Sequence, residues 1–149
     1  MMPSMTKDFP YPVVMRLSPV PWAGDRALAR VMAALGTEFG VSTLIVGGAV
    51  RAAVRGQKAA DIDLATTLTP DQVMARAVQA DLRAVPTGLD HGTVTIVADG
   101  RGFEVTTLRK DIKTDGRHAQ VEFTDDWGAD AARRDFTLNA LYPNFAGDV

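Results

Sequence analysis

Apolar residues recur at helical spacing in two segments of the chain. The first is DRALARVMAALGTEFG, residues 25–40, whose apolar positions fall on one helical face: Leu28, Val31, Met32 and Leu35. Asp25 precedes this segment as an N-cap, and Gly40 marks its end. The second is TPDQVMARAVQADL, residues 69–82. It carries an N-cap threonine, a proline at the first helical position and a glutamine at the third, which predict a capping box: Thr69, Pro70 and Gln72.

Continuous and alternating apolar runs predict strands. STLIV (residues 42–46) and ADIDLAT (residues 60–66) read as short buried strands, with a short helix over residues 49–55 between them. After Pro86 the pattern turns to strands, and GTVTIVADGRGFEVTTLR (residues 92–109) contains two alternating runs. They are joined through the dipeptide Asp99-Gly100, which is typical of a tight hairpin.

The remaining segments are less regular. KDIKTDGRHAQ, residues 110–120, is polar and has no apolar face, so it predicts a mobile loop. A further helix begins near Asp126, and residues 138–149 indicate a strand that enters a turn. Residues 1–21 are rich in Pro and Met and are read as an N-terminal arm, which leaves residues 22–149 as one domain. Because the last strand has no partner after its turn, we expect a piece of a longer protein.

Composition narrows the class of protein. The chain has 149 residues, of which 46% are hydrophobic and 23% charged, as expected for one globular domain with a buried core. The formal net charge of −2 argues against a polycation that binds nucleic acid over its whole surface. Cys is absent and His occurs twice, which excludes disulfides and thiolate metal sites and argues against zinc. No apolar segment indicates a membrane span, so we expect a cytoplasmic protein.

Carboxylates interrupt two of the apolar runs. In a strand, Asp61 and Asp63 share one face, with their Cα atoms roughly 6.5 Å apart, while the residues between and after them point into the core. Glu104 is flanked by apolar residues in the same way. If the strands that carry them are neighbours, three carboxylates converge into a set of oxygen ligands for one or two Mg²⁺ ions. The alternative is that the Asp pair is only the solvated face of an edge strand.

Glycines and arginines supply candidate anion-binding groups. Gly47 and Gly48 lie between a strand and a short helix, where backbone N–H groups and the helix dipole favour a phosphate, and Arg51 follows on the first turn. A Gly-Gly pair alone is usually only a tight turn, but here it stands shortly before the D-x-D pattern. Downstream, Arg133-Arg134 are open to two interpretations: cations at a helix C-terminus, or nucleotide ligands with Asp135 bound to a ribose hydroxyl.

LIVGGAVRAAVRGQKAADIDLATTLTPDQV together with AARRDFTLNAL resembles the head domain of bacterial tRNA nucleotidyltransferases (CCA-adding enzymes) and of bacterial poly(A) polymerases. These are class II members of the polymerase-β-like nucleotidyltransferase superfamily. The resemblance extends from about Trp22 to Val149 and implies an α+β fold with a mixed, mostly antiparallel sheet flanked by helices. The family pattern G-G-x-V-R-D departs here at its last position, which is Ala52.

The resemblance implies roles for the residues singled out above. Catalytic carboxylates would be Asp61 and Asp63, which hold Mg²⁺, with Glu104 as a third acidic residue. Nucleotide-binding residues would be Gly47, Gly48, Arg51, Arg133, Arg134 and Asp135. The segment at residues 110–120 takes the place of the family's flexible loop. The family's base-selecting neck and its tRNA-binding domains follow the head and would not lie within this chain.

The implied activity is transfer of CMP and AMP from CTP and ATP to the 3′ end of tRNA, with release of pyrophosphate. One alternative is poly(A) addition to another RNA 3′ end, which a head domain alone does not distinguish from CCA addition. Another is a nucleotide- or RNA-binding fragment without turnover, since Ala52 and the absent neck could each abolish catalysis. A Rossmann-type dinucleotide binder is disfavoured because the sequence has no G-x-G-x-x-G.

Overall fold

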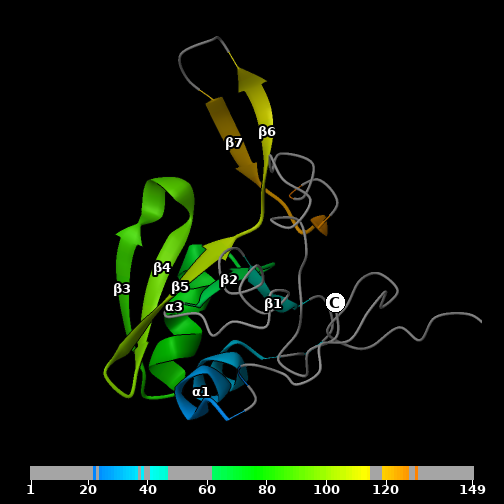
Figure 1. Cartoon of the computed structure of the whole chain (residues 1–149). Coiled ribbons are helices and arrows are strands. Elements are labelled where there is room, and N and C mark those ends of the chain that lie inside the picture. The colour runs from blue at the N-terminus through cyan, green and yellow to red at the C-terminus, as the bar shows by residue number, and fades with distance from the viewer. Residues whose placement is uncertain are drawn as a thin grey trace, which may run out of the picture.

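The computed structural model describes residues 22, 24–36, 38, 41–46, 62–114, 119–127 and 130. This part of the chain forms helices, strands and one short 3-10 turn (Figure 1). In chain order they are α1 (Arg26–Leu35), β1 (Thr43–Val46), β2 (Asp63–Thr66), α3 (Pro70–Gln79), β3 (Arg83–Gly88), η1 (Leu89–His91), β4 (Thr93–Ala98), β5 (Arg101–Thr107), β6 (Arg109–Thr114) and β7 (Ala119–Phe123). Neither helix of the described residues has the length and apolar character needed to cross a membrane.

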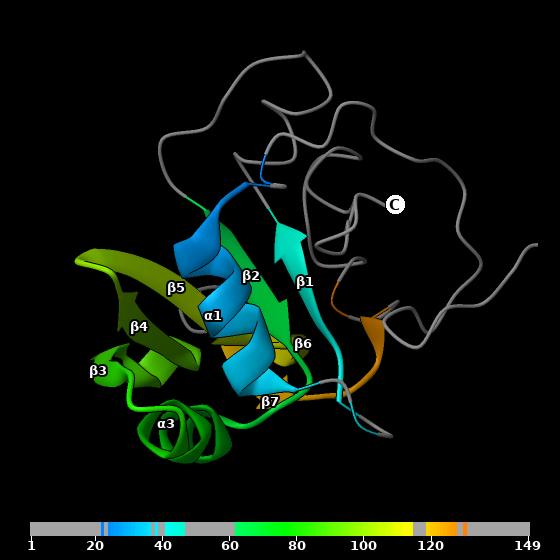
Figure 2. The same ribbon diagram turned by 90° about the horizontal axis from the view of Figure 1, so that it is seen from below.

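Five strands form one mixed sheet in the order β1-β2-β5-β4-β3. The central pair β2 and β5 runs parallel, and every other neighbouring pair in this sheet is antiparallel. Helices α1 and α3 both lie on the same face of the sheet (Figure 2). The mixed, mostly antiparallel sheet with flanking helices that the family resemblance implied is therefore confirmed, with the helices on one side only among the described elements.

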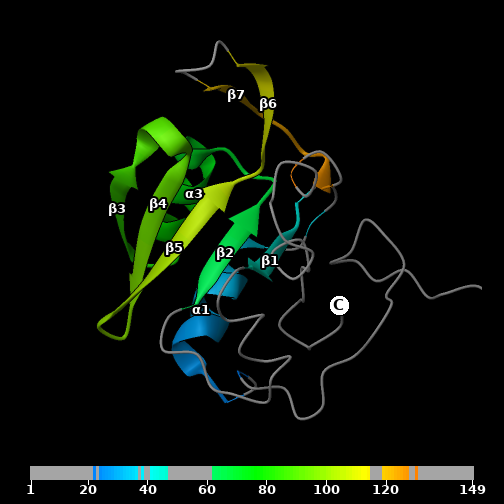
Figure 3. The same cartoon turned by 45° about the horizontal axis from the view of Figure 1, so that its top comes forward.

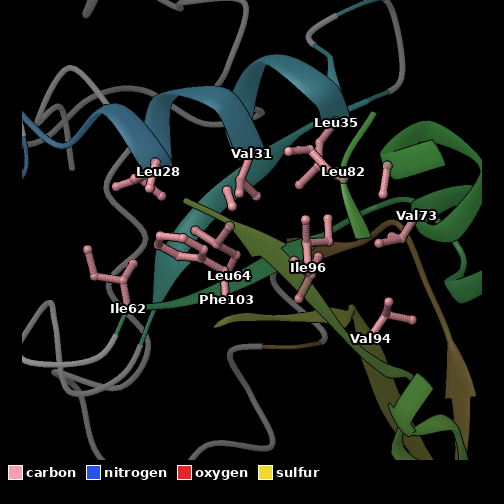
Figure 4. Packing of buried hydrophobic residues seen from close by; sticks show 14 of the residues in the cluster. Leu28, Val31, Leu35, Ile62, Leu64, Val73, Leu82, Val94, Ile96 and Phe103 are labelled. Carbon is pink, nitrogen blue, oxygen red and sulfur yellow. The ribbon is translucent and has the colours of Figure 1, made fainter. Parts of the chain in front are cut away.

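The main core lies between the two helices and the sheet. Helix α1 buries the apolar stripe expected from its spacing, and in Figure 4 Leu28, Val31 and Leu35 point toward the strands. From the sheet they meet alternate residues of the strands and Ile62, which immediately precedes β2. All are almost fully buried: Ile62, Leu64, Val94, Ile96, Phe103 and Val105. Alternation along each strand therefore divides the sheet into a helix-covered face and an opposite, open face.

Both helix starts are confirmed, whereas the first helix ends earlier than predicted. Asp25 caps α1 by accepting the Leu28 N–H at 3.0 Å. The helix ends at Leu35 and not near Gly40, because Gly36 already takes a φ of +80°, which glycine adopts without a Cβ penalty. At α3 the capping box is complete: the Gln72 N–H donates to the Thr69 hydroxyl oxygen at 3.4 Å, and the Thr69 N–H donates to Gln72 Oε1 at 2.9 Å.

The β4–β5 hairpin is confirmed, and a third strand joins it. Asp99 and Gly100 have φ of +51° and +78°, as a tight two-residue hairpin turn requires. The sequence pattern placed the first strand of this region after Pro86, but β3 begins before that proline and includes it. Proline is tolerated there because β3 is an edge strand with a register shift between Val85 and Gly88.

The loop predicted over residues 110–120 is wrong for most of its length. Residues 109–114 and 119–123 form β6 and β7, which pair as an antiparallel two-stranded ribbon. This ribbon projects from the sheet in Figures 1 and 3. Residues 115–118, at its tip, lie outside the described part. Backbone hydrogen bonds between the two strands define this ribbon. β6 (RKDIKT) contains a single apolar residue, whereas β7 (AQVEF) does alternate apolar and polar residues, but only its first two residues fall within 110–120. The dipeptide Asp115-Gly116 was the available hairpin signal.

The start of a helix near Asp126 is confirmed within the described residues. Trp127 and Asp130 have helical backbone, and the Asp130 N–H donates to the Asp126 carbonyl at 3.2 Å. Three other predicted segments lie outside the described residues: the arm at 1–21, the helix at 49–55 and the strand at 138–149.

Candidate functional site

Asp63 and Glu104 lie side by side on the open face of the sheet. They are Cα partners in the parallel pairing of β2 with β5, so their side chains leave the sheet on the same side. Adjacent strands lie about 4.8 Å apart, which brings the two carboxylates within reach of one cation. The residues that follow them in each strand, Leu64 and Val105, are fully buried on the helix-covered face. The structure therefore brings together two of the three carboxylates that the sequence predicted.

The position of this pair in the sheet is unusual for charged residues. Strands β2 and β5 are the central, parallel pair, and parallel strands in globular proteins are usually apolar on both faces. Glu104 is exposed, Asp63 is partly exposed, and within the described part of the chain no hydrogen bond or ion pair involves the Glu104 carboxylate. Two adjacent carboxylates repel each other unless a cation or a proton lies between them. Their placement fits the binding of a hard divalent cation.

Hydroxyl groups continue the polar surface beyond Glu104. Its cross-strand partner on β4 is Thr95, whose hydroxyl is hydrogen-bonded to that of Thr87 on β3 at 2.8 Å. The hydroxyls of Thr93 and Thr106 pair in the same way at 2.9 Å. Hydroxyl groups from β3, β4 and β5 therefore lie beside Glu104 on the open face.

A second apolar cluster covers the other end of the open face. It consists of Leu44, Val46, Ala65, Leu108 and Trp127, all nearly fully buried. By strand alternation its β1 and β2 members point to the same side of the sheet as Asp63. Figures 1 and 2 show the segment after β7, in orange, returning to the β1 edge. The helical turn that carries Trp127 is thus packed on the face that carries the carboxylates.

The other predicted site residues lie outside the described part of the chain: Gly47, Gly48, Arg51, Asp61, Arg133, Arg134 and Asp135. Among the described residues, no group of three or more His, Cys, Asp or Glu side chains could hold a metal ion. The predicted triad includes Asp61, which lies outside the described residues. Val46, the β1 partner of Asp63, immediately precedes Gly47 in the chain.

Sequence reasoning missed Asp130 and Trp127. Both are buried, and the Asp130 carboxylate accepts a hydrogen bond from the Arg109 N–H at 3.2 Å. The signal that could have found Asp130 is its spacing, because it stands three and four residues before Arg133 and Arg134 in the helix that the sequence predicts.

The mixed sheet with helices on one face and paired carboxylates on the other is the arrangement of a polymerase-β-like nucleotidyltransferase head. Residues 43–149 match the family described as the Poly A polymerase head domain, and the chain belongs to this family. The solved Bacillus stearothermophilus CCA-adding enzyme in complex with CTP superposes with a TM-score of 0.68 and is 33% identical. The match covers 86% of this chain and 29% of that one.

The relatives that match the chain in sequence are also named as CCA-adding enzymes or CCA tRNA nucleotidyltransferases. The human and mouse proteins named CCA tRNA nucleotidyltransferase 1, mitochondrial, are each 50% identical over 106 residues, which is 70% of this chain and 24% of theirs. The CCA-adding enzyme of Bacillus cytotoxicus is 39% identical over 114 residues, or 75% of this chain and 28% of its own. The chain therefore spans about a quarter of the length of these relatives.

Proposed function

We propose that this chain is the catalytic head of a metal-dependent RNA nucleotidyltransferase. It would transfer CMP and AMP from CTP and ATP to the 3′ end of tRNA and release pyrophosphate. The observation that carries this proposal is the pairing of Asp63 with Glu104 on the open face of a nucleotidyltransferase-type sheet. Support for the substrates comes from relatives that are named CCA-adding enzymes, one of them solved with CTP.

Asp61, Asp63 and Glu104 are proposed to hold Mg²⁺. The adjacent carboxylates of Asp63 and Glu104 supply the oxygen ligands that this ion prefers, and Asp61 precedes Asp63 at the spacing that places both on one strand face. When bound, Mg²⁺ would neutralise triphosphate charge and favour ionisation of the RNA 3′-hydroxyl. The three side chains position the ion and compensate its charge, and none of them is the nucleophile.

Gly47, Gly48 and Arg51 are proposed to bind the triphosphate. Support comes from the end of β1, because Val46 lies opposite Asp63 and the glycine pair follows it directly. Small residues let backbone N–H groups approach phosphate oxygens, and an arginine adds a charge-assisted hydrogen bond. The anion-binding turn would then adjoin the carboxylates.

Arg133, Arg134 and Asp135 are proposed to bind the sugar and phosphates of the incoming nucleotide. Support comes from the preceding helical turn, since Trp127 packs on the sheet face that carries Asp63. The RNA 3′-hydroxyl attacks the α-phosphorus and pyrophosphate leaves, so the chain contributes positioning and charge neutralisation.

Two alternatives remain specific enough to test. The family description names poly(A) polymerase, which would add AMP alone. Ala52, where the family motif has an aspartate, favours nucleotide binding without turnover. The cytoplasmic location expected from the sequence stays a proposal, because the human and mouse relatives are named mitochondrial.

The test combines calorimetric titration with an extension assay on a tRNA that lacks its CCA end. With Mg²⁺, the chain should bind CTP and ATP and extend the tRNA with both nucleotides. Asp63→Asn and Glu104→Gln should each reduce extension at least about 100-fold, whereas Asp71→Asn, a charge-matched change on α3, should not. Addition of AMP alone supports poly(A) synthesis, and binding without extension supports the fragment without turnover. Unaltered Mg²⁺-dependent binding in both site variants would overturn the metal assignment.

A further inference from the structure

The junction between β5 and β6 draws its hydrogen-bond partners from separate segments of the chain. The Leu108 N–H donates to the Thr66 carbonyl of β2 at 2.9 Å, and the Leu108 carbonyl accepts the Thr124 N–H at 2.9 Å. The next backbone donor, the Arg109 N–H, is bound by Oδ1 of Asp130 at 3.2 Å. A side chain thus completes a junction that is otherwise held by backbone groups.

Asp130 is the most deeply buried charged side chain in the described part of the chain, with 1% of its surface exposed. A carboxylate is costly to bury unless hydrogen bonds compensate it, and the Arg109 N–H supplies one. The donor depends on the acceptor in turn, because a backbone N–H without a partner in the interior is destabilising. A helical turn that holds such a carboxylate is therefore fixed in position relative to β6.

Trp127 fixes the same turn a second time through apolar contacts. It belongs to the cluster on the open face, together with Leu108 from the junction and Val46 and Ala65 from β1 and β2. Figure 3 shows the orange segment beside β1. One turn is thus joined to the sheet by a polar contact at Asp130 and an apolar contact at Trp127, on the side where Asp63 lies.

We propose that Asp130 is a positioning residue for the nucleotide-binding segment that begins at Arg133. Arg133 follows Asp130 by three residues, less than one helical turn. By holding the turn against the Arg109 backbone, the Asp130 carboxylate fixes the point from which the chain continues toward Arg133. Small displacements of binding groups cost large factors in affinity and rate. This inference rests on the proposed function, and Asp130 itself touches no substrate.

The test compares three variants of the chain. Asp130→Ala removes the acceptor, Asp130→Asn keeps an oxygen for the Arg109 N–H, and Thr69→Ala destabilises α3 on the opposite face as a stability control. Hydrogen–deuterium exchange without nucleotide should show amides at residues 131–139 exchanging roughly tenfold faster in Asp130→Ala. The Asp130→Asn and Thr69→Ala variants should stay within about threefold of the wild type in that segment. The dissociation constant for CTP with Mg²⁺ should rise roughly tenfold in Asp130→Ala alone.

Each outcome bears on the proposal. Exchange in residues 131–139 that is the same in Asp130→Ala and wild type would overturn it, as would an equal rise in Thr69→Ala. A loss of CTP affinity in Asp130→Asn as large as in Asp130→Ala would assign the effect to charge and also overturn the positioning role. If the wild-type chain binds no CTP, the proposed function fails, while the exchange data still decide whether Asp130 holds the segment.

Discussion

Arg101 places Nη1 at 2.9 and 2.8 Å from the two carboxylate oxygens of Asp25, which joins the first residue of β5 to the N-cap of α1. The Leu28 N–H donates to the same carboxylate at 3.0 Å. Burial by itself raises the pKa of Asp25, but the Leu28 N–H and the Arg101 guanidinium outweigh it and hold the pKa below its usual range. One carboxylate therefore caps a helix and fastens it to the sheet.

The first prediction concerns the acid dependence of stability. Because the pKa of Asp25 is lowered in the folded protein, its contribution is complete above the ordinary aspartate pKa of about 3.9 and is lost as the pH falls through the lower folded value. Asp25→Asn should cost about 0.5–1 kcal/mol of unfolding free energy near pH 7, and this difference should shrink toward pH 3. Urea unfolding across that range measures it. A difference that does not vary with pH would contradict the lowered pKa.

The second prediction concerns the turn beneath the β6–β7 ribbon. Gly92 has a φ of +77°, and a Cβ there would lie 2.6 Å from the Phe123 ring. Gly100 has nearly the same φ, +78°, and nothing within 4 Å of such an atom, so it is a matched control. Gly100→Ala should cost about 1 kcal/mol for its backbone alone, and Gly92→Ala about 1 kcal/mol more.

Thermal and urea unfolding would measure both glycine variants. The double variant Gly92→Ala/Phe123→Ala should lose only the unfolding free energy that Phe123→Ala loses plus about 1 kcal/mol for the backbone at residue 92. The new Cβ atom then no longer meets the Phe123 ring. Equal unfolding free energies for Gly92→Ala and Gly100→Ala would show that the contact with the Phe123 ring does not lower stability.

A third prediction concerns the start of α3. Thr69→Ala removes the hydroxyl that accepts the Gln72 N–H and should lower the unfolding free energy by about 1 kcal/mol. Thr69→Ser keeps the hydroxyl and should remain within about 0.5 kcal/mol of the wild type. Equilibrium urea unfolding of the two variants is the measurement, and similar losses in both would assign the effect to the Thr69 methyl group.

The fourth prediction separates function from stability at Glu104. The side chain is exposed, and the hydrogen bonds and ion pairs of the described residues do not include it. Glu104→Gln should therefore change the unfolding free energy by less than about 0.5 kcal/mol while abolishing Mg²⁺-dependent transfer. Thermal unfolding measured beside the extension assay checks both parts. A strongly destabilised variant would mean that Glu104 has a structural role.

Short-range signals in the sequence predicted the elements well where one residue determines local geometry. Thr69 and Gln72 form the capping box because each reaches a backbone group three residues away. Asp99 and Gly100 form the hairpin turn because both adopt positive φ. The capping box and the hairpin turn form between neighbouring residues and require no contact with distant parts of the chain. The pattern failed at β6, where mostly polar residues form a strand by pairing with β7.

The arrangement of the candidate site depends on contacts between distant segments. Alternation predicted that Asp63 and Glu104 each point away from the core, but not that β2 and β5 would be neighbours in register. In the same fold α1 and α3 pack on one face of the whole sheet, so the pairing belongs to an arrangement of distant segments. Asp130 is a stronger case, because its partner is a backbone N–H far away in the chain, for which no residue type gives a signal.

Residue order thus sets where each helix and turn begins, because capping and positive φ are decided within a few bonds. Which carboxylates meet, and which turn packs beside them, is set by burial of apolar surface across the whole domain. Burial is a sum over distant segments and so is not readable from any one of them.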